Sequence, residues 1–532
     1  MRIRTTVHVV GFLVAMVGAA MLLAAAVALI HREEDLLAHL VAAGIAIAVG
    51  LGAFFFTREP KDDRRIEVSH REAFAVVTFG WLACCMFGAL PYLCFAHLPP
   101  LLFSDAPERA DAAVGAKTPT VSPPDCAARE GLGRELCSPV NAVFESTSGF
   151  TTTGATILTD GLWENPETRS GGLPHGLLFW RALTHFLGGM GIIVLGVAIL
   201  PLLGVGGMQL FKAEVPGPVK DKMVPRIGET ARLLWKVYAG LTALEVLLLL
   251  TTGQGPYLAI CHAFATMATG GFSPLAASIE GLGSPLAEWI VALFMFLAGI
   301  NFALHFNSLR RRRLIYAADH EFRFYAALAV LFAAGMGVYL LVGSDLGAHD
   351  SLRAGVFQSL TILTTTGFSS QNFAAWAPAG QMLIFALFFV GGCSGSTGGG
   401  VKSVRVLLMI KLALSELKRL VHPHGVIQTK LSGRVVRDDV LHSVAGFVIL
   451  YLVLFFVSAL AFGIAGHDLV TSLTAVGASI GNIGPGLGPV GPSGNYEFLA
   501  APLKGLCIFD MIAGRLEIYS VLIVLTPEFW RR

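Results

Sequence analysis

Four short segments of the chain carry residue types that could bind a dehydrated cation. Each combines uncharged, mostly small side chains with glycine and follows a short helix-like stretch. Threonine hydroxyls and backbone carbonyls supply oxygen ligands without net charge, and glycine permits backbone angles closed to other residues. Arranged about one axis, such segments would replace the ion's water shell with carbonyl oxygens, as potassium filters do. These filter segments comprise Thr152, Thr153, Gly154, Thr269, Gly270, Gly271, Thr365, Thr366, Gly367, Asn482, Ile483 and Gly484.

The composition predicts that membrane helices position these segments. Of the 532 residues, 54% are hydrophobic and 14% are charged, and the mean hydropathy is +0.68. A span needs about 20 apolar residues. The first apolar run, 7–30, is too long for the core of a signal peptide and predicts a membrane helix. Ten such runs predict ten spanning helices, which begin near Val7, Leu37, Ala73, Leu177, Leu233, Leu286, Phe324, Met382, Leu441 and Leu499.

Four further apolar stretches are too short to cross a bilayer, because 10 to 14 residues do not span it. They cover 139–150, 257–267, 352–363 and 468–479, and each ends just before a filter segment. We predict that they are half-depth helices that enter the membrane and return. The irregular backbone that follows is tolerated at this depth only where protein buries it or water reaches it.

The four filter glycines recur at intervals of 117, 96 and 117 residues. Each interval holds two predicted spans and one half-depth helix, so the repeating unit is helix, half-depth helix with filter segment, helix. The alternative is that these Gly and Thr residues only pack helices together, but four copies at this spacing favour a filter. We therefore predict an all-α polytopic membrane protein with an N-terminal hairpin, 1–68, and four pseudo-symmetric repeats around a pore, 69–208, 229–313, 320–420 and 436–532.

Lysine and arginine placement predicts the orientation, because positively charged loops stay in the cytoplasm. Residues 58–71, 212–232, 310–313 and 402–437 carry most of the positive charge, whereas 252–284 carries none. Both termini are therefore expected on the cytoplasmic side. A basic run such as 310–313 can bind nucleic acid, but beside a membrane helix it is a topology signal, and we expect no nucleic-acid partner.

Two of the eight cysteines lie in a polar loop that the charge pattern places outside. They are Cys126 and Cys137, and disulfides form in that compartment. The sequence leaves open whether the two are bridged. No matching histidine pair accompanies them, so a metal site is not expected.

Two further features interrupt the apolar pattern. Residues 391–400, here called the glycine-rich loop, contain Gly391, Gly392, Gly395, Gly398, Gly399 and Gly400. A stable helix is not expected there, and the simplest explanation is a kinked helix with close neighbours. Arg515 lies about midway in the last apolar run, where insertion costs about 2.5–3.5 kcal/mol. A salt bridge to Glu517 or Asp510 is the explanation that the sequence itself offers for Arg515.

Taken together, these motifs resemble the TrkH/TrkG/KtrB potassium-uptake family of the superfamily of K+ transporters. The resemblance covers nearly the whole chain, and the extra N-terminal helix pair is more similar to TrkH than to KtrB. It implies that the glycine-rich loop is a gate beneath the filter and that Arg515 is an electrostatic barrier to cations. The stretches that carry it are 151–156, 268–273, 364–368, 481–486, 391–402 and 514–517.

The resemblance also implies the function and the partners. The expected function is K+ uptake across the bacterial inner membrane, with K+ passing through the filter residues and no organic cofactor on this chain. The expected partners are the lipid bilayer, a second copy of the chain in a homodimer, and a TrkA-like cytoplasmic regulator that binds NAD(H) or ATP/ADP. The fourth filter segment, which continues into Pro485, departs from the other three. We therefore expect moderate selectivity for K+ over Na+ and passage of Rb+.

The main alternative is an H+- or Na+-coupled K+ symporter that works by alternating access. Such a mechanism needs carboxylates near the midplane, and the candidates are Glu145 and Glu245. Glu145 can equally brace its half-depth helix by hydrogen bonding. No nucleotide fingerprint or catalytic constellation occurs in a suitable setting, so enzyme activity is not expected. Three intramembrane histidines are expected to be packed rather than to act as ligands: His185, His262 and His305.

Overall fold

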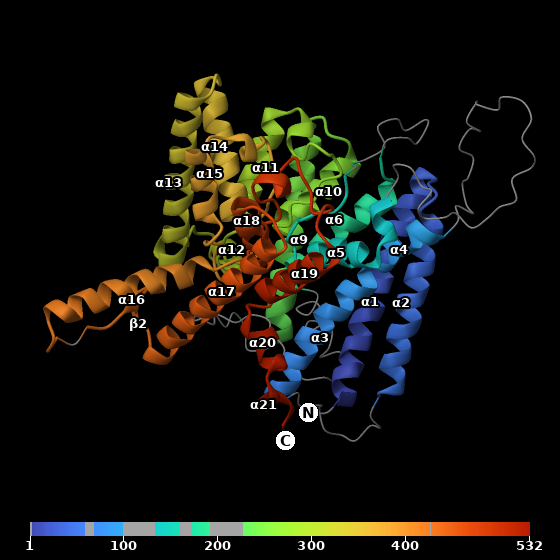
Figure 1. Ribbon diagram of the computed structural model, residues 1–532, viewed down its shortest axis with the longest axis horizontal. Coiled ribbons are helices and arrows are strands. Elements are labelled where there is room, and N and C mark those ends of the chain that lie inside the picture. The colour runs from blue at the N-terminus through green and yellow to red at the C-terminus, as the bar shows by residue number, and fades with distance from the viewer. Residues whose placement is uncertain are drawn as a thin grey trace, which may run out of the picture.

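The computed structural model describes residues 3–58, 69–98, 134–159, 161, 172–191, 227–425 and 427–531. Its described parts are helical except for one small hairpin, β1 (Lys430–Leu431) and β2 (Arg434–Val435). This confirms the all-α polytopic fold class. The predicted repeat 69–208 and the basic loop 212–232 lie partly outside the described residues. Both chain ends lie at the same end of the molecule (Figure 1).

Six helical stretches among the described residues are long and apolar enough to cross a membrane. Two form the predicted N-terminal hairpin, and the other four begin the predicted repeats. α3 and α4 together make one of these stretches. The helices are α1 (Ile3–His31), α2 (Leu36–Phe56), α3 (His70–Gly88), α4 (Leu90–His97), α9 (Ile227–Leu250), α13 (His320–Gly343) and α17 (Asp438–Ile464).

The four half-depth helices are present, and their ends agree with the prediction to within four residues. Each is followed directly by its filter segment, so we call them the pore helices. Their buried positions run nearly all the way round each helix towards its C-terminal end, as expected of helices enclosed by protein. They are α5 (Pro139–Phe150), α10 (Pro256–Met267), α14 (Ala348–Leu363) and α18 (Leu469–Ile480).

The prediction of ten spanning helices is wrong for the part of the chain that the structure describes, because the second helix of each repeat ends or breaks early. The first ends at Gly189, and the second bends by 95° around residues 299–301. The glycine-rich loop interrupts the third, and residues 516–518 interrupt the fourth, where Glu517 and Ile518 have positive φ. The composition of residues 391–400 predicted the third of these breaks, whereas hydropathy did not reveal the others. The helices are α6 (His175–Gly189), α11 (Pro285–Ala298), α12 (Phe302–Arg311), α15 (Pro378–Leu387), α16 (Ser403–Val421), α19 (Ala501–Arg515), α20 (Tyr519–Leu525) and α21 (Pro527–Trp530).

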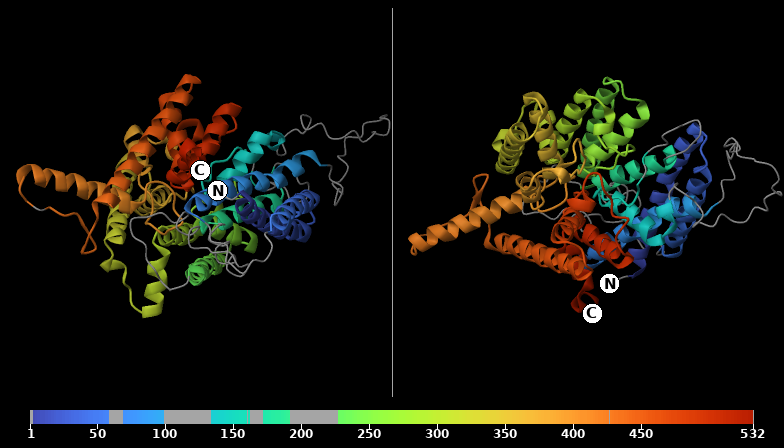
Figure 2. Two further views of the ribbon diagram at one scale, coloured as in Figure 1. Left: turned by 90° about the horizontal axis from the view of Figure 1, so that it is seen from below. Right: turned by 45° about the horizontal axis from the view of Figure 1, so that its top comes forward.

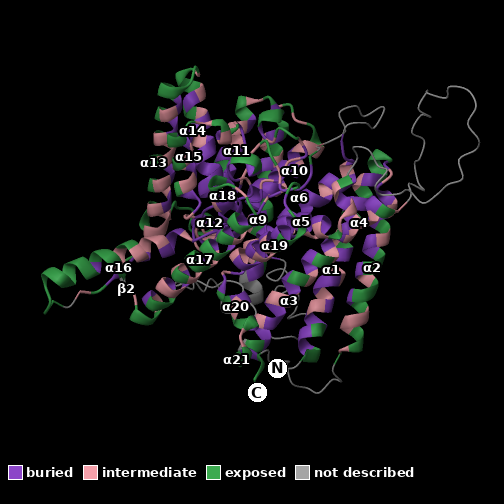
Figure 3. Ribbon diagram, in the orientation of Figure 1, coloured by how far each residue is buried: buried purple, intermediate pink, exposed green. Residues whose placement is uncertain are grey.

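The repeats surround a common centre. In Figure 2 the cyan-green, green, yellow and orange-red groups lie around the middle of the molecule, and the blue N-terminal helices stand at its edge. There α1 packs against α2, α3 and α6. Figure 3 shows burial concentrated where the pore helices meet, whereas α13 and the projecting α16 expose much of their length. The centre is therefore the best enclosed part of the fold.

Candidate ion pathway

The four filter segments share one backbone conformation. The first residue of each is left-handed, although none of these four is glycine: φ is 53° at Thr152, 54° at Thr269, 58° at Thr365 and 51° at Asn482. The third residue, glycine, is left-handed again, with φ between 81° and 96°. In a regular strand successive carbonyls alternate in direction. Alternating the sign of φ turns them to the same side, which is the arrangement a cation needs.

The filter segments also contact one another in a closed ring. A Cβ added to Gly154 would collide with the carbonyl oxygen of Gly270 in the second segment. The remaining glycines face the next segments in the same order: Gly271 faces Thr366, Gly367 faces Ile483, and Gly484 faces Thr153. Each segment thus touches the next, and the fourth returns to the first. The structure therefore brings all twelve predicted residues together around one axis.

A hollow of about 520 Å³ opens on one side of this ring. All four filter glycines line it, together with the residues that follow each filter segment. Two charged side chains, Arg181 and Glu280, also reach its wall. Because the pore helices approach from this side, the hollow has the position expected of an outer vestibule.

One residue of each pore helix stands nine positions before its filter glycine, and three of these residues brace the filter from behind. Glu145 accepts hydrogen bonds from the Thr156 hydroxyl and the Ile157 amide, at 3.1 and 3.0 Å. His262 bonds to the Ser273 hydroxyl at 3.0 Å. In the third repeat, the Gln358 amide bonds to Ser370 and Gln371, whereas Ala475 occupies the fourth position. Of the two roles open to Glu145, the contacts show the brace.

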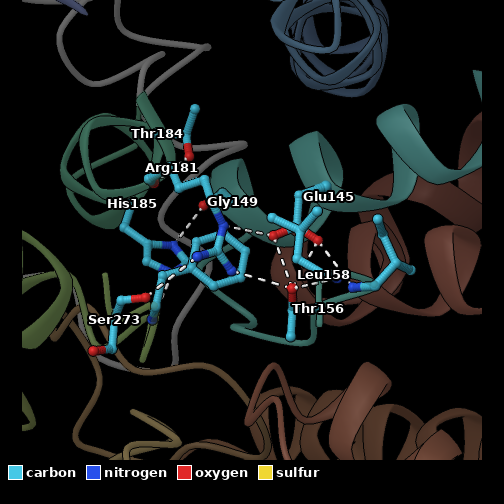
Figure 4. A network of polar contacts seen from close by, with 10 residues as sticks. Glu145, Gly149, Thr156, Leu158, Arg181, Thr184, His185 and Ser273 are labelled. Carbon is cyan, nitrogen blue, oxygen red and sulfur yellow. Dashed lines mark hydrogen bonds and ion pairs between the residues drawn. The ribbon is translucent and has the colours of Figure 1, made fainter. Parts of the chain in front are cut away.

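Sequence reasoning missed Arg181 on α6, which completes this brace. Its Nε lies 2.7 Å from Glu145 Oε1, and both side chains are almost fully buried. The guanidinium also donates to the Thr156 hydroxyl and to the Ser273 carbonyl, and it lies 4.0 Å from the centre of the Phe272 ring. Figure 4 shows this network joining the first and second repeats. The pair could have been predicted, because the sequence places an arginine and a glutamate in apolar surroundings, and charges within a membrane pair with one another.

The three histidines are packed, as predicted. His185 Nδ1 bonds to the Gly149 carbonyl at 2.8 Å, and its Nε2 accepts from the Phe272 amide at 3.2 Å. His305 bonds to Tyr316 and to the Leu297 carbonyl. Among the described residues no group of His, Cys, Asp and Glu could hold a metal ion. Cys137 takes part in a disulfide, and Cys126 lies outside the described residues.

Replacing Glu145 by glutamine is expected to loosen the brace, because Arg181 would stay buried without its counter-charge. Breaking a buried ion pair costs about 3–5 kcal/mol. We expect a clear fall in melting temperature in detergent and weaker discrimination between K+ and Na+ in flux. The matched control is Glu288→Gln, which breaks the more exposed pair with Arg353, where the side chains are 14% and 19% exposed. Equal effects of the two substitutions would contradict the role of Glu145.

The glycine-rich loop lies against the ring on the side opposite the vestibule. The Gly399 amide donates to the Thr365 hydroxyl at 2.7 Å, and the Thr397 hydroxyl donates to the Met267 carbonyl at 3.0 Å. Gly399 also lies against Asn482, where a Cβ would be only 2.7 Å from the asparagine Cβ. The loop therefore contacts the second, third and fourth repeats just below the filter. The bonds from Gly391 to Val401 and from Ser403 to Gly392 close its base.

Arg515, at the end of α19, connects the glycine-rich loop to the first repeat. It donates to the Thr397 carbonyl at 2.7 Å and to the Gly188 and Gly189 carbonyls at 2.6 and 2.9 Å. Gly188 and Gly189 end α6, so the arginine joins three repeats under the filter. The structure therefore brings the predicted gating residues, which are Arg515 and the six glycines of the glycine-rich loop, together below the filter.

Charged residues hold the base of the loop, among them Glu321, which the sequence analysis did not single out. Glu321 accepts hydrogen bonds from the amides of Ser394 and Val404. Lys402 donates to the Gly398 carbonyl. Glu517, one of the two carboxylates considered for Arg515, pairs with Arg405. The other, Asp510, accepts a hydrogen bond from Ser458 at 3.0 Å.

Comparison with known proteins identifies the family. A family model described as TrkH, cation transport protein, matches residues 72–531. The chain is 38% identical to the Trk system potassium uptake protein TrkH of Halomonas elongata and to that of Escherichia coli K12, in each case over 100% of both chains. It is 32% identical to TrkG of Escherichia coli K12 over 99% of both chains.

The fold is similar to the crystal structure of the potassium transporter TrkH from Vibrio parahaemolyticus, with a TM-score of 0.81 and 33% identity over 100% of both chains. Sequence and structure thus agree over the whole length, including the N-terminal helix pair. The chain is a multi-pass membrane protein that belongs to the TrkH family of cation transport proteins, a family of transporters rather than enzymes.

Proposed function

We propose that this protein takes up K+ across the bacterial inner membrane through the ring of filter segments. The closed ring of contacts among the four filter segments carries this proposal, because it gathers carbonyl oxygens from all four repeats around one axis. A dehydrated cation needs such a set of oxygens. The relatives named above are potassium uptake proteins, which identifies the cation. The membrane potential drives its entry.

The glycine-rich loop and Arg515 act as the gate in this proposal. The loop is bonded to Thr365 and Met267 directly below the filter, so an ion leaving the filter meets it first. Arg515 holds the loop through the Thr397 carbonyl and adds a positive charge to the path. Loop displacement and loss of this contact would open the way to the cytoplasm.

A cytoplasmic partner controls the gate, and two copies of the chain form a homodimer. The basic stretch 402–437, part of which forms the projecting α16 (Figure 1), offers a docking face together with Arg310 and Arg311. The partner proposed is a TrkA-like regulator that binds NAD(H) or ATP/ADP. α16 leads from the glycine-rich loop into this basic face, so a docked partner could pull directly on the loop.

The symport alternative keeps one specific observation in its favour. Glu145 is engaged with Arg181, whereas Glu245 on α9 is buried, and no Lys or Arg pairs with it among the described residues. A carboxyl in such surroundings could carry a proton. Glu245 is therefore the residue on which a coupled mechanism would depend.

Uptake of ⁸⁶Rb⁺ into proteoliposomes tests the proposal. With an imposed potential and no proton or sodium gradient, we expect uptake that K+ inhibits more strongly than Na+. Uptake that needs a proton gradient and is lost in Glu245→Gln would favour symport. The absence of K+-sensitive uptake in either condition, with the TrkA-like partner present, would overturn the proposed function.

A further inference from the structure

A hollow of about 710 Å³ lies between α9 and α12, away from the ion pathway. It exists because α12 turns away from α11 by 95°. α12 buries Phe302, Ala303 and His305 on one face and exposes Leu309 and Arg310 near its end. With ten residues, α12 is too short to cross a membrane by itself.

The hollow combines apolar walls with a basic mouth. Three cations line it, Lys236 on α9 and Arg312 and Arg313 just after α12, and none of the described residues that line it is acidic. All three cations are exposed. This arrangement complements a phosphate group. The apolar lining includes Leu233, Val237, Leu241, Phe306, Leu309 and Leu314.

The surroundings place the mouth of the hollow at the bilayer surface. Beyond Lys236, α9 exposes Leu244, Leu247 and Leu250, which are 47%, 62% and 37% exposed. Such a face belongs in hydrocarbon, so Lys236 stands where headgroups give way to acyl chains. A free phosphate would use the cations but not the apolar walls, whereas an amphiphile would use both.

We propose that the hollow binds one anionic phospholipid, such as phosphatidylglycerol. Lys236, Arg312 and Arg313 hold the headgroup phosphate, and an acyl chain follows the apolar wall formed by Val237 and Leu241. Basic pockets between membrane helices bind anionic headgroups in this way. Its volume falls within the range of about 300–1,000 Å³ typical of ligand sites.

The bound lipid would rest on a helix that adjoins the glycine-rich loop. The Phe302 amide, at the start of α12, donates to the Gly395 carbonyl at 3.0 Å. The Cys393 amide donates to the Gly299 carbonyl at 2.8 Å. Binding itself does not depend on these contacts, and it can be measured without transport.

Native mass spectrometry of the full chain, titrated with phosphatidylglycerol or phosphatidylcholine, tests the proposal. We expect one phosphatidylglycerol to bind tightly and phosphatidylcholine not to compete for its place. The triple variant K236Q/R312Q/R313Q should lose on the order of 100-fold in affinity for phosphatidylglycerol. The control K418Q/R419Q/R437Q removes the same charge from exposed positions outside the hollow and should keep the tight site.

A second variant tests the apolar part without touching the charges. Gly240 lines the hollow, and a Cβ there would meet nothing within 4 Å, so Gly240→Trp fills the space without disturbing the helix. It should also abolish the tight site, whereas Gly335→Trp, at an equally open position on α13, should not. Equal affinity for both lipids would overturn the proposal. So would competition by glycerol phosphate with no effect of Gly240→Trp, because that result would mean a simple anion site.

Discussion

Replacing Gly367 by alanine is expected to abolish most of the preference for K+ over Na+. The added Cβ would overlap the Ile483 carbonyl oxygen of the next filter segment and approach Pro485 Cδ to 2.8 Å. In addition, φ at Gly367 is +81°, a region that costs a residue with a Cβ about 1–2 kcal/mol. Either the ring expands or the Ile483 carbonyl rotates away from the axis. Both outcomes remove an oxygen ligand from the ion.

The expected loss of selectivity follows from the strength of one contact between a carbonyl oxygen and the cation. A hydrogen bond to a charged group contributes about 1.5–3 kcal/mol, and we take a carbonyl–cation contact to be of similar strength. Its loss corresponds to about tenfold or more in selectivity. The measurement is ⁸⁶Rb⁺ uptake with K+ and Na+ as competitors. The control is Gly335→Ala on α13, where a Cβ meets nothing within 4 Å; if both variants keep the wild-type selectivity, the ring does not select the ion.

The pore helices could be predicted because two independent signals agree on them. Their length excludes a span, and each runs into a filter segment that recurs along the chain. The structure adds that the filter segments share one backbone conformation, as the matching φ values at Thr152, Thr269, Thr365 and Asn482 show. Asn482 is informative, because its type differs from threonine while its backbone does not. Repetition therefore carried more information than residue type.

Of the breaks in the second helices, only the glycine-rich loop was predicted, from its composition; the other breaks were missed, because hydropathy averages over them. Glu517 and Ile518 interrupt α19 and α20 with positive φ, although neither is a residue that favours this conformation. The reason lies in tertiary contacts, such as the pairing of Glu517 with Arg405 far away in the sequence. The partnership of Glu145 with Arg181 was missed for a similar reason. The spacing of residues along the chain does not show which residue of a pore helix faces which residue of the next helix.

Neutralising Arg515 is expected to raise the basal ⁸⁶Rb⁺ flux in the absence of any partner. Arg515→Gln removes the donors that hold the Thr397, Gly188 and Gly189 carbonyls together, so the glycine-rich loop loses its anchor to the first repeat. It also removes a charge from the path. A unit charge about 8 Å from a cation costs ~2 kcal/mol at an effective dielectric constant of about 20, which corresponds to about thirtyfold in rate.

Arg515→Lys separates the anchor from the charge. Lysine keeps the positive charge, but a compact ammonium does not span three carbonyls on two elements as the planar guanidinium does. If the charge alone limits the flux, the ⁸⁶Rb⁺ flux through Arg515→Lys stays as low as that of the wild type. If the anchor contributes, as the contacts to Thr397 and Gly188 lead us to expect, its flux lies between those of the wild type and Arg515→Gln. The control is Arg437→Gln, an exposed arginine before α17 that pairs with Asp439.

The selectivity of the faster variants decides what the increase means. The filter segments are built from residues 152–154, 269–271, 365–367 and 482–484, and their mutual contacts do not involve Arg515. Flux through Arg515→Gln should therefore still be inhibited more by K+ than by Na+, because only the gate has changed. A rise in flux with loss of this preference would mean that the whole pore has come apart. No rise at all would mean that neither the charge nor the anchor of Arg515 limits ion passage.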